Sequence, residues 1–175
     1  MQRPHNEVSE HSVARLNDLA DGQATVGLRT CCAADAWVHS MLARRPFGSL
    51  GSLLDAGGSS VLAMDDETLV QALAAHARIG ERRTGTGREA GWSRTEQAAA
   101  LAADDDIQVL LAEGNRAYEE RFGHVFLIRA AGRSAQEMHD ALRSRLANDE
   151  TTERSVVRDE LAEIVRLRLT RLVTE

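Results

Sequence analysis

The sequence predicts an all-α fold, a single-domain compact helical bundle of about seven to nine helices with one short extended segment. Three observations support this prediction. Apolar residues recur at helical spacing, and residues that favour helix N-termini precede several of these stretches. Only one short run has β character, and an isolated strand cannot form a sheet. The 175 residues are 43% hydrophobic but only 3% aromatic, so they can bury one mainly aliphatic core.

The N-terminal part of the chain is expected to begin with a tail and two helical stretches. Residues 1–8 are polar and are predicted to be a loose N-terminus, followed by a single helical domain over residues 9–175. Ser12 can cap a short first helix. A second helical stretch, either continuous or broken in the middle, runs from about residue 24 to residue 43. It must end before Pro46, which cannot continue a helix.

Two short helices and a long loop are expected next. The tetrapeptide Gly57-Gly58-Ser59-Ser60 interrupts an apolar stretch, which suggests two helical pieces joined by a turn. Asp65 or Asp66 caps the following helix, which ends near His76. Residues 77–91 are rich in Gly, Arg and Thr and form the longest predicted loop. Loops longer than about 12 to 15 residues are usually functional or disordered, so a site is expected here first.

The remaining helix starts are marked by capping signals. These signals are Ser93-Arg94-Thr95-Glu96, Asp104-Asp105-Asp106 and Ser134-Ala135-Gln136-Glu137. The run with β character, residues 122–128, lies before the last of them and is interpreted as an extended segment. Thr151 or Thr152 begins a long final helix that reaches about Val173.

Composition argues against several classes of function. All 21 basic residues are arginines and there are 27 acidic residues, so the net charge of −6 predicts no bulk attraction to nucleic acid. No stretch approaches the roughly 18 to 20 apolar residues of a membrane span, and the first residues lack the hydrophobic segment of a signal peptide. We therefore expect a cytoplasmic protein. Cys31 and Cys32 are adjacent and do not suggest a disulfide, and no residue pattern predicts a metal site.

Three polar residues have both a structural and a functional interpretation. Arg168 falls inside the apolar stripe of the last helix, which predicts an anionic partner, unless its long side chain reaches solvent near the helix end. His76 lies on the face of Leu69 and Leu73, where it is either a core histidine or a proton donor. Glu96 either completes the capping box or points into a cleft. Together the three suit a small anionic substrate.

Several short motifs are specific through their order and spacing. They are Trp37, Arg45-Pro46-Phe47, His76-Ala77-Arg78-Ile79-Gly80, Ser93-Arg94-Thr95-Glu96-Gln97, Asn115-Arg116-Ala117-Tyr118, Phe122-Gly123-His124-Val125-Phe126 and Ile164-Val165-Arg166-Leu167-Arg168-Leu169. In this arrangement the chain resembles the 2-oxo-4-hydroxy-4-carboxy-5-ureidoimidazoline (OHCU) decarboxylases of urate breakdown. The resemblance extends from about Leu16 to Leu172.

The resemblance implies an all-helical enzyme without a cofactor, commonly a homodimer, that converts OHCU to (S)-allantoin and releases carbon dioxide. It implies that His76 is the catalytic histidine, that Glu96 is the active-site glutamate and that Arg168 is the arginine near the end of the last helix. The residues that it assigns to substrate binding are Ala77, Ser93, Gln97, Ile128, Arg129, Ala130, Ala131 and Gly132.

One position departs from the family pattern. Ala77 follows His76 where the family usually has proline, so the backbone gains freedom and one N–H donor. This change motivates an alternative hypothesis, a ureide-binding protein on the same scaffold with weak or no turnover. A third hypothesis is a helical interaction module in which His76, Glu96 and Arg168 are structural and do not converge.

Overall fold

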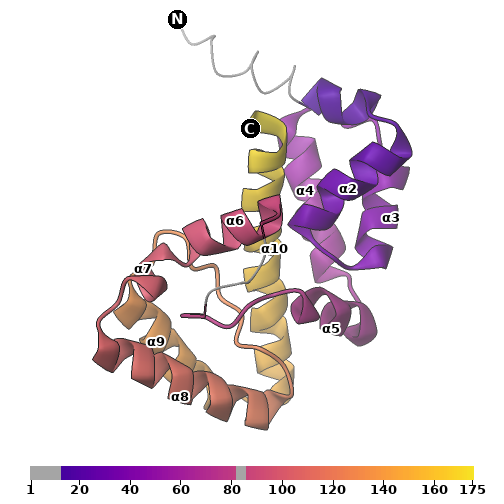
Figure 1. The fold of residues 1–175 in the computed structure, drawn as a ribbon. Helices are drawn as coiled ribbons and strands as arrows, with labels where there is room; N and C mark the ends of the chain where they lie inside the picture. Colours follow the sequence, from indigo (N-terminus) through magenta and orange to yellow (C-terminus); the bar gives the residue numbers. More distant parts are fainter. Residues whose placement is uncertain (1–12, 82–85) are drawn as a thin grey trace, which may run out of the picture. The chain divides into compact units, whose positions relative to one another are not determined.

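The computed structural model of the protein describes residues 13–81 and 86–175. Residues 13–18 are helical, and the following helices are α2 (Asp21–Cys31), α3 (Asp35–Ala43), α4 (Leu50–Leu62), α5 (Asp66–Ala74), α6 (Arg88–Glu96), α7 (Ala98–Leu101), α8 (Asp105–Phe122), α9 (Ala135–Arg145) and α10 (Glu150–Thr174) (Figure 1). No residue of the described ranges lies in a β-strand, which confirms the predicted all-α class. The loose tail expected over residues 1–8 and the cap expected at Ser12 lie outside the described residues.

The chain divides into two compact units. The first contains the described residues up to Ala72 together with Ala162–Glu175, and the second contains the described residues of Leu73–Leu161. The boundaries between the units fall inside α5 and α10. Each unit has its own buried residues, so each is described separately below.

Buried aliphatic residues and one tryptophan form the core of the first unit. Its fully buried members include Leu28, Trp37, Met41, Leu53, Val61, Val165 and Leu169. Phe47 is also buried, and its main chain makes two hydrogen bonds of 2.9 Å with the side-chain amide of Asn17. Arg45 donates to the carbonyl oxygens of Leu16 and Leu19 at 3.0 and 2.8 Å, where the first helical residues end. The turn around Phe47 is therefore held against the start of the chain.

The expected interruption at Gly57-Gly58-Ser59-Ser60 is wrong, because α4 is continuous through these residues. Both glycines are buried against α10. A Cβ atom on Gly57 would lie 2.4 Å from Leu169 Cδ1, and one on Gly58 would lie 2.4 Å from the guanidinium of Arg166. The glycines therefore allow α4 to approach the last helix closely. In this sequence the glycine pair indicates a close contact between helices, not a turn.

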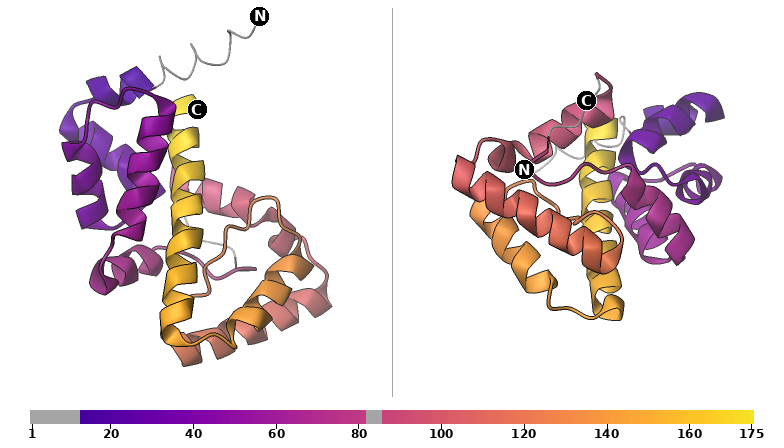
Figure 2. Two further views of the ribbon diagram at one scale, coloured as in Figure 1. Left: turned by 180° about the vertical axis from the view of Figure 1, so that it is seen from behind. Right: turned by 60° about the horizontal axis from the view of Figure 1, so that its bottom comes forward.

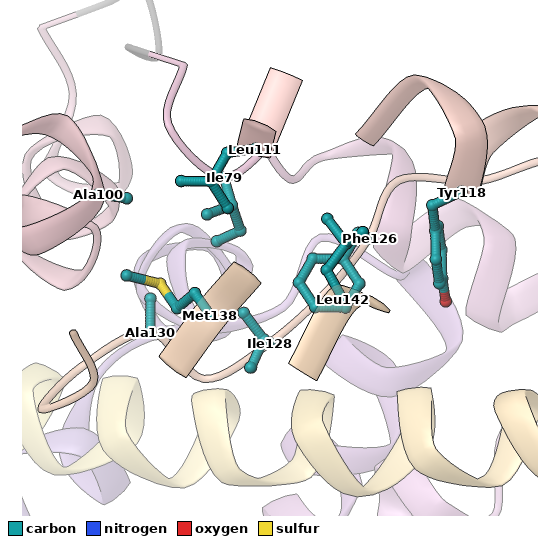
Figure 3. Packing of buried hydrophobic residues seen from close by; sticks show 9 residues of the cluster. All are labelled: Ile79, Ala100, Leu111, Tyr118, Phe126, Ile128, Ala130, Met138 and Leu142. Carbon is teal, nitrogen blue, oxygen red and sulfur yellow. The ribbon is translucent and has the colours of Figure 1, made fainter. Parts of the chain in front are cut away.

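The core of the second unit lies between α8, α9 and the segment that joins them. Figure 3 shows its cluster of buried residues, which are Ile79, Ala100, Leu111, Tyr118, Phe126, Ile128, Ala130, Met138 and Leu142. Helices α8 and α9 lie side by side in every view (Figures 1 and 2). A Cβ atom on Gly114 would lie 2.5 Å from Leu142 Cδ2, so a glycine also permits close contact here.

Most predicted helix starts are confirmed, and one is wrong. Asp65 Oδ1 accepts from the amide of Thr68, Asp104 caps α8, and Ser134 forms a capping box with Glu137 at the start of α9. Ser93 does not begin a helix, because α6 already starts after Gly87 and Ser93 lies in its C-terminal half. The predicted loop is correspondingly shorter than expected.

Two further helix starts differ in detail from the expectation. The second helical stretch begins at Asp21 instead of about residue 24. It is broken in the middle, as one of the two alternatives allowed, with α2 ending at Cys31 and α3 starting at Asp35. The last helix starts at Glu150, one or two residues before the expected start at Thr151 or Thr152, with Asp149 accepting from the amide of Thr152 at 2.8 Å.

Candidate active site

His76 lies just after the C-terminal end of α5. Its main-chain N–H donates to the carbonyl of Leu73 at 2.9 Å, which closes a last turn after Ala74. Both His76 and Ala77 are half-buried. The imidazole is therefore held near a helix end, as the sequence predicts, and is still partly accessible to a small molecule.

Two side-chain amides hold the turn that follows His76. Asn115 of α8 donates from Nδ2 to the carbonyl of Ile79 at 2.8 Å, and Gln97 Oε1 accepts from the amide of Gly80 at 3.1 Å. Gly80 has a φ of 85°, a left-handed conformation that favours glycine. Because Ala77 does not restrict the backbone as proline would, these bonds supply the restraint on this turn.

A partly exposed ion pair between Arg78 and Glu119 also fixes this turn. Arg78 Nε and Nη2 donate to the two carboxylate oxygens of Glu119 at 2.6 and 2.9 Å. The hydrogen bond from Arg78 holds the pKa of the Glu119 carboxyl below its usual value of 4.5. A two-bond pair of this kind fixes orientation as well as charge. The segment from His76 to Gly80 is thus tied to α8 at two of its residues.

The inner face of α6 is polar. Ser93, Glu96 and Gln97 lie three and four residues apart, so they share one face, and each is at most 9% exposed. A helix of a purely structural domain would place apolar side chains on such a buried face. Buried polar side chains are typical of sites that bind polar ligands as well as of internal hydrogen-bond networks, and one of them, Gln97, binds the turn after His76.

Side chains also supply the hydrogen bonds of the segment between α8 and α9. The carbonyl of Leu127 accepts from Arg145 Nη1 at 2.6 Å, and the amide of Arg129 donates to Glu160 Oε2 at 2.7 Å. Ile128 and Ala130 are buried, and Gly132 has a φ of 82°. The predicted contact residues therefore lie on a segment whose main chain is fixed by its neighbours.

A buried polar cluster stabilises that segment. Glu153 is fully buried, accepts two hydrogen bonds from Arg145 and one from the hydroxyl of Tyr118, and binds Asn148 at 2.8 Å. Burial, followed by the hydrogen bond to Glu153, raises the pKa of the Tyr118 hydroxyl above its usual value. The Arg145 guanidinium also lies 4.6 Å from the ring centroid of Phe126.

Arg168 is 3% exposed, which confirms that it lies within the apolar stripe of α10. It belongs to the first unit, whereas His76, Ser93, Glu96 and Gln97 belong to the second. The convergence of Arg168 with the other predicted site residues stays a prediction. Within the second unit, the structure connects Gln97 directly to the turn after His76.

The first unit contains an open hollow of about 250 Å³. It is lined by Ala36, Trp37, Ser40, Arg44, Ser60, Ala63, Met64, Asp65 and Thr68. None of the predicted site residues lines it. Over residues 13–81 and 86–175, no group of three or more His, Cys, Asp or Glu side chains is arranged to hold a metal ion. In the same ranges no helix is both long and apolar enough to cross a membrane.

Comparison with known proteins decides the family. The model of the family described as OHCU decarboxylase matches residues 17–170, which include every predicted site residue. The chain belongs to the OHCU decarboxylase family.

Two curated relatives of this chain are bifunctional proteins. It is 28% identical over 161 residues to the uric acid degradation bifunctional protein PucL of Bacillus subtilis, covering 91% of this chain and 32% of that protein. It is 27% identical over 150 residues to the uric acid degradation bifunctional protein TTL of Arabidopsis thaliana, covering 84% of this chain and 46% of that protein. The chain therefore spans less than half the length of either relative.

Solved structures support the decarboxylase fold. A crystal structure of an OHCU decarboxylase in the presence of (S)-allantoin matches with a TM-score of 0.74 and 23% identity, covering 90% of this chain and 100% of that one. A crystal structure of an (S)-allantoin synthase matches with a TM-score of 0.70 and 14% identity, covering 92% of this chain and 54% of that one. At these identities the likeness shows the fold alone.

Sequence reasoning assigned no role to several residues that shape the candidate site. Asn115 was part of a family landmark, and its position four residues after Leu111 and three before Tyr118 places an amide on an apolar face. An amide on an apolar helix face could have been predicted from the sequence to have a buried hydrogen-bond partner. Glu160 and Arg145 gave no such signal, because charged residues are common on helices and their partners are main-chain groups far along the sequence.

Proposed function

We propose that this chain converts OHCU to (S)-allantoin with release of carbon dioxide, and that His76 donates the proton. The observation that carries the proposal is the family match over residues 17–170, which includes His76, Glu96 and Arg168. The buried polar face of α6 and the fixed turn after His76 support it, since both are features that a small polar ligand needs.

The proposed chemistry needs no cofactor, because the substrate supplies its own electron sink. The bond between the ring carbon and its carboxylate breaks, and the electron pair moves toward the neighbouring C=N group as carbon dioxide leaves. This forms a C=C bond between the two ring carbons and leaves the C=N electrons on the nitrogen, which takes up a proton. His76 then donates a proton to one face of the carbon of the former C=N group, while the hydroxyl on the carbon that lost carbon dioxide gives up its proton and becomes a carbonyl. The protonated face sets the configuration of the product. General acid catalysis of this kind contributes about 10² to 10⁴-fold.

The other residues would bind and orient the substrate. Arg168 would pair with an anionic oxygen, and Glu96 would orient the hydroxyl or ureido group. Ser93 and Gln97 share the buried face of α6 with Glu96, and Ala77 contributes an additional main-chain donor beside His76. Main-chain groups among residues 128–132 would bind carbonyl and carboxylate oxygens.

We further propose that the enzyme acts in the cytoplasm as a homodimer. The family resemblance supports the dimer, and the composition supports the compartment. Light scattering of the purified protein should give twice the chain mass of 19.1 kDa. A mass of one chain at micromolar concentration would contradict the dimer without bearing on the decarboxylase activity.

The decisive experiment for the proposed function uses freshly generated OHCU. Circular dichroism follows the appearance of (S)-allantoin with and without the protein, because spontaneous decay does not favour one enantiomer. The proposal predicts a faster, enantiomerically pure signal that scales with protein concentration. Binding of (S)-allantoin without any acceleration would instead support a ureide-binding protein, and the absence of both would contradict the proposal.

A further inference from the structure

The segment that joins α8 and α9 has its main chain fixed along one edge. On this edge, Arg145 donates to the carbonyl of Leu127, and Glu160 accepts from the amide of Arg129. The carbonyl of Arg129 accepts from the Nε of Arg133 at 3.1 Å. Both main-chain polar groups of Arg129 are therefore already used within the second unit.

The packing of this segment indicates that it is extended, since Leu127 is buried as well but does not belong to the same cluster as its neighbours. The side chains of Phe126, Ile128 and Ala130, at every second position, belong to the buried cluster between α8 and α9 (Figure 3). A repeat of two residues is the side-chain period of an extended chain. In such a chain the N–H and C=O groups of successive residues point to opposite edges, so those of Ile128 and Ala130 point away from the edge that Arg145 and Glu160 bind.

The opposite edge carries two main-chain donors that are not used within the second unit. No hydrogen bond between described residues of this unit engages the amides of Ile128 and Ala130, although these residues are only 3% and 5% exposed. Buried main-chain N–H groups are almost always paired with protein, water or a ligand. Two such donors on one edge suit the oxygen atoms of a carboxylate or a carbonyl group.

We propose that Glu160 and Arg145 are positioning residues for the substrate. By binding Arg129 and Leu127 on one edge, they hold the amides of Ile128 and Ala130 toward substrate oxygens on the other. This inference rests on the proposed function and deepens it, because it selects two donors from the five residues expected to contact the substrate.

Glu160 is the better of the two residues for a test. Arg145 is part of the buried cluster with Glu153 and Tyr118, so its removal would disturb the core. The Glu160 side chain is 18% exposed, and its other bond is a longer contact of 3.4 Å with Arg133. A change at Glu160 therefore removes the bond to Arg129 while leaving the buried cluster intact.

The kinetic test compares two variants of Glu160 with a matched control. Glu160→Ala removes the acceptor and should raise KM about tenfold, with a smaller change in kcat, because the substrate donors are no longer fixed. Glu160→Gln keeps an acceptor oxygen and should restore KM to within about threefold of the wild-type value. Glu163→Ala removes a more exposed carboxylate of the same helix and should leave both constants unchanged.

A second measurement observes the donors themselves. In the wild-type protein, titration with (S)-allantoin should shift the amide resonances of Ile128 and Ala130 more than that of Arg129. In Glu160→Ala, the Arg129 amide should exchange with deuterium faster than in Glu163→Ala. The titration needs only the wild-type protein, so it decides the inference even if Glu160→Ala does not fold.

These outcomes separate the inference from the proposed function. An active enzyme in which Glu160→Ala keeps the wild-type KM, or in which Arg129 shifts as much as its neighbours, would overturn the positioning role. A wild-type protein that neither forms nor binds (S)-allantoin would contradict the proposed function. For such an inactive protein, deuterium exchange still tests the hold of Glu160 on the main chain. If the Arg129 amide exchanges no faster in Glu160→Ala than in the wild type, the positioning role is overturned. Faster exchange would support the part of the inference in which Glu160 fixes this main chain.

Discussion

At the scale of single residues, the candidate site depends on polar side chains placed where apolar ones would pack more simply. Asn115 is 1% exposed and uses its amide nitrogen to bind the carbonyl of Ile79, while no hydrogen bond within the described residues reaches its Oδ1. Unpaired buried acceptors are unfavourable. The presence of an asparagine here is explained by its hydrogen bond to Ile79, which fixes the turn after His76.

Asn115→Ala tests this role. Removal of the amide leaves the buried carbonyl of Ile79 without its partner, so the free energy of unfolding should fall by about 1 to 3 kcal/mol. The turnover number should fall as well, because His76 loses its fixed position. Urea unfolding and steady-state kinetics measure the two effects. Glu113→Ala, at an exposed position of α8, should change stability by less than about 0.5 kcal/mol.

The departure at Ala77 also belongs to this scale. Sequence comparison with the family pattern suggests a looser turn, yet three side chains hold the residues that follow, namely Gln97, Asn115 and Glu119. Such contacts connect positions 17 to 41 residues apart, so they could not be inferred from local sequence. Their effect is to restrain the residues after Ala77 through hydrogen bonds.

At the scale of elements, local capping chemistry was predictable and helix contact was not. Asp104 and Ser134 were correctly identified as caps, because a cap depends on residues only three positions apart. The same rule failed at Ser93 and Glu96, whose spacing matches a capping box but also places them on one buried face inside α6. Only the burial of that face separates the two interpretations.

The glycine pair in α4 gives a prediction for this scale. Gly57→Ala would place a methyl group 2.4 Å from Leu169 Cδ1, and Leu169 is fully buried, so it can move little. Overpacking of this kind should lower the free energy of unfolding by about 1 to 3 kcal/mol. Chemical denaturation measures the change.

Gly51→Ala provides the matched control in the same helix. A Cβ atom at Gly51 meets only Ser49 Oγ, at 3.7 Å, so no clash is expected. The higher helix propensity of alanine should stabilise the protein by up to about 1 kcal/mol. If both glycine variants had the same effect, close contact between α4 and α10 would not be the reason for Gly57.

At the scale of the whole molecule, the all-α class was predictable because no stretch of the sequence supports a sheet. The division into two compact units was not predictable, since its boundaries fall inside α5 and α10. Periodicity identifies a helix but not the residues on which it packs. The positions of Glu160 and Arg145 beside a distant main chain were hidden for the same reason.

The response to acid is a property of the whole molecule that follows from several carboxylates. Hydrogen bonds lower the pKa of Glu119, through Arg78, of Glu137, through Ser134, and of Asp149, through Thr152. A carboxyl whose pKa is lower in the folded state stabilises the protein above its usual pKa, and that stabilisation is lost as pH falls through the folded value.

The free energy of unfolding should therefore be nearly constant from about pH 7 to pH 5 and fall below about pH 4. Glu119→Gln should make this decline shallower, because one of the contributing carboxyls no longer binds a proton. Thermal unfolding at a series of pH values measures both curves. Glu120→Gln, at an exposed neighbouring position, serves as the control, and an equal effect of both variants would contradict the role of the Arg78 pair.

The measurement that tests the central claim most directly is the enantiomeric purity and rate of allantoin formation by the wild-type protein and by His76→Asn. The wild type should form only the (S) enantiomer, and His76→Asn should be about 10² to 10⁴-fold slower while it keeps the helical content of the wild type. His39→Asn, at an exposed histidine of α3, should behave as the wild type. Unchanged, stereospecific turnover by His76→Asn would contradict the assignment of His76 as the proton donor.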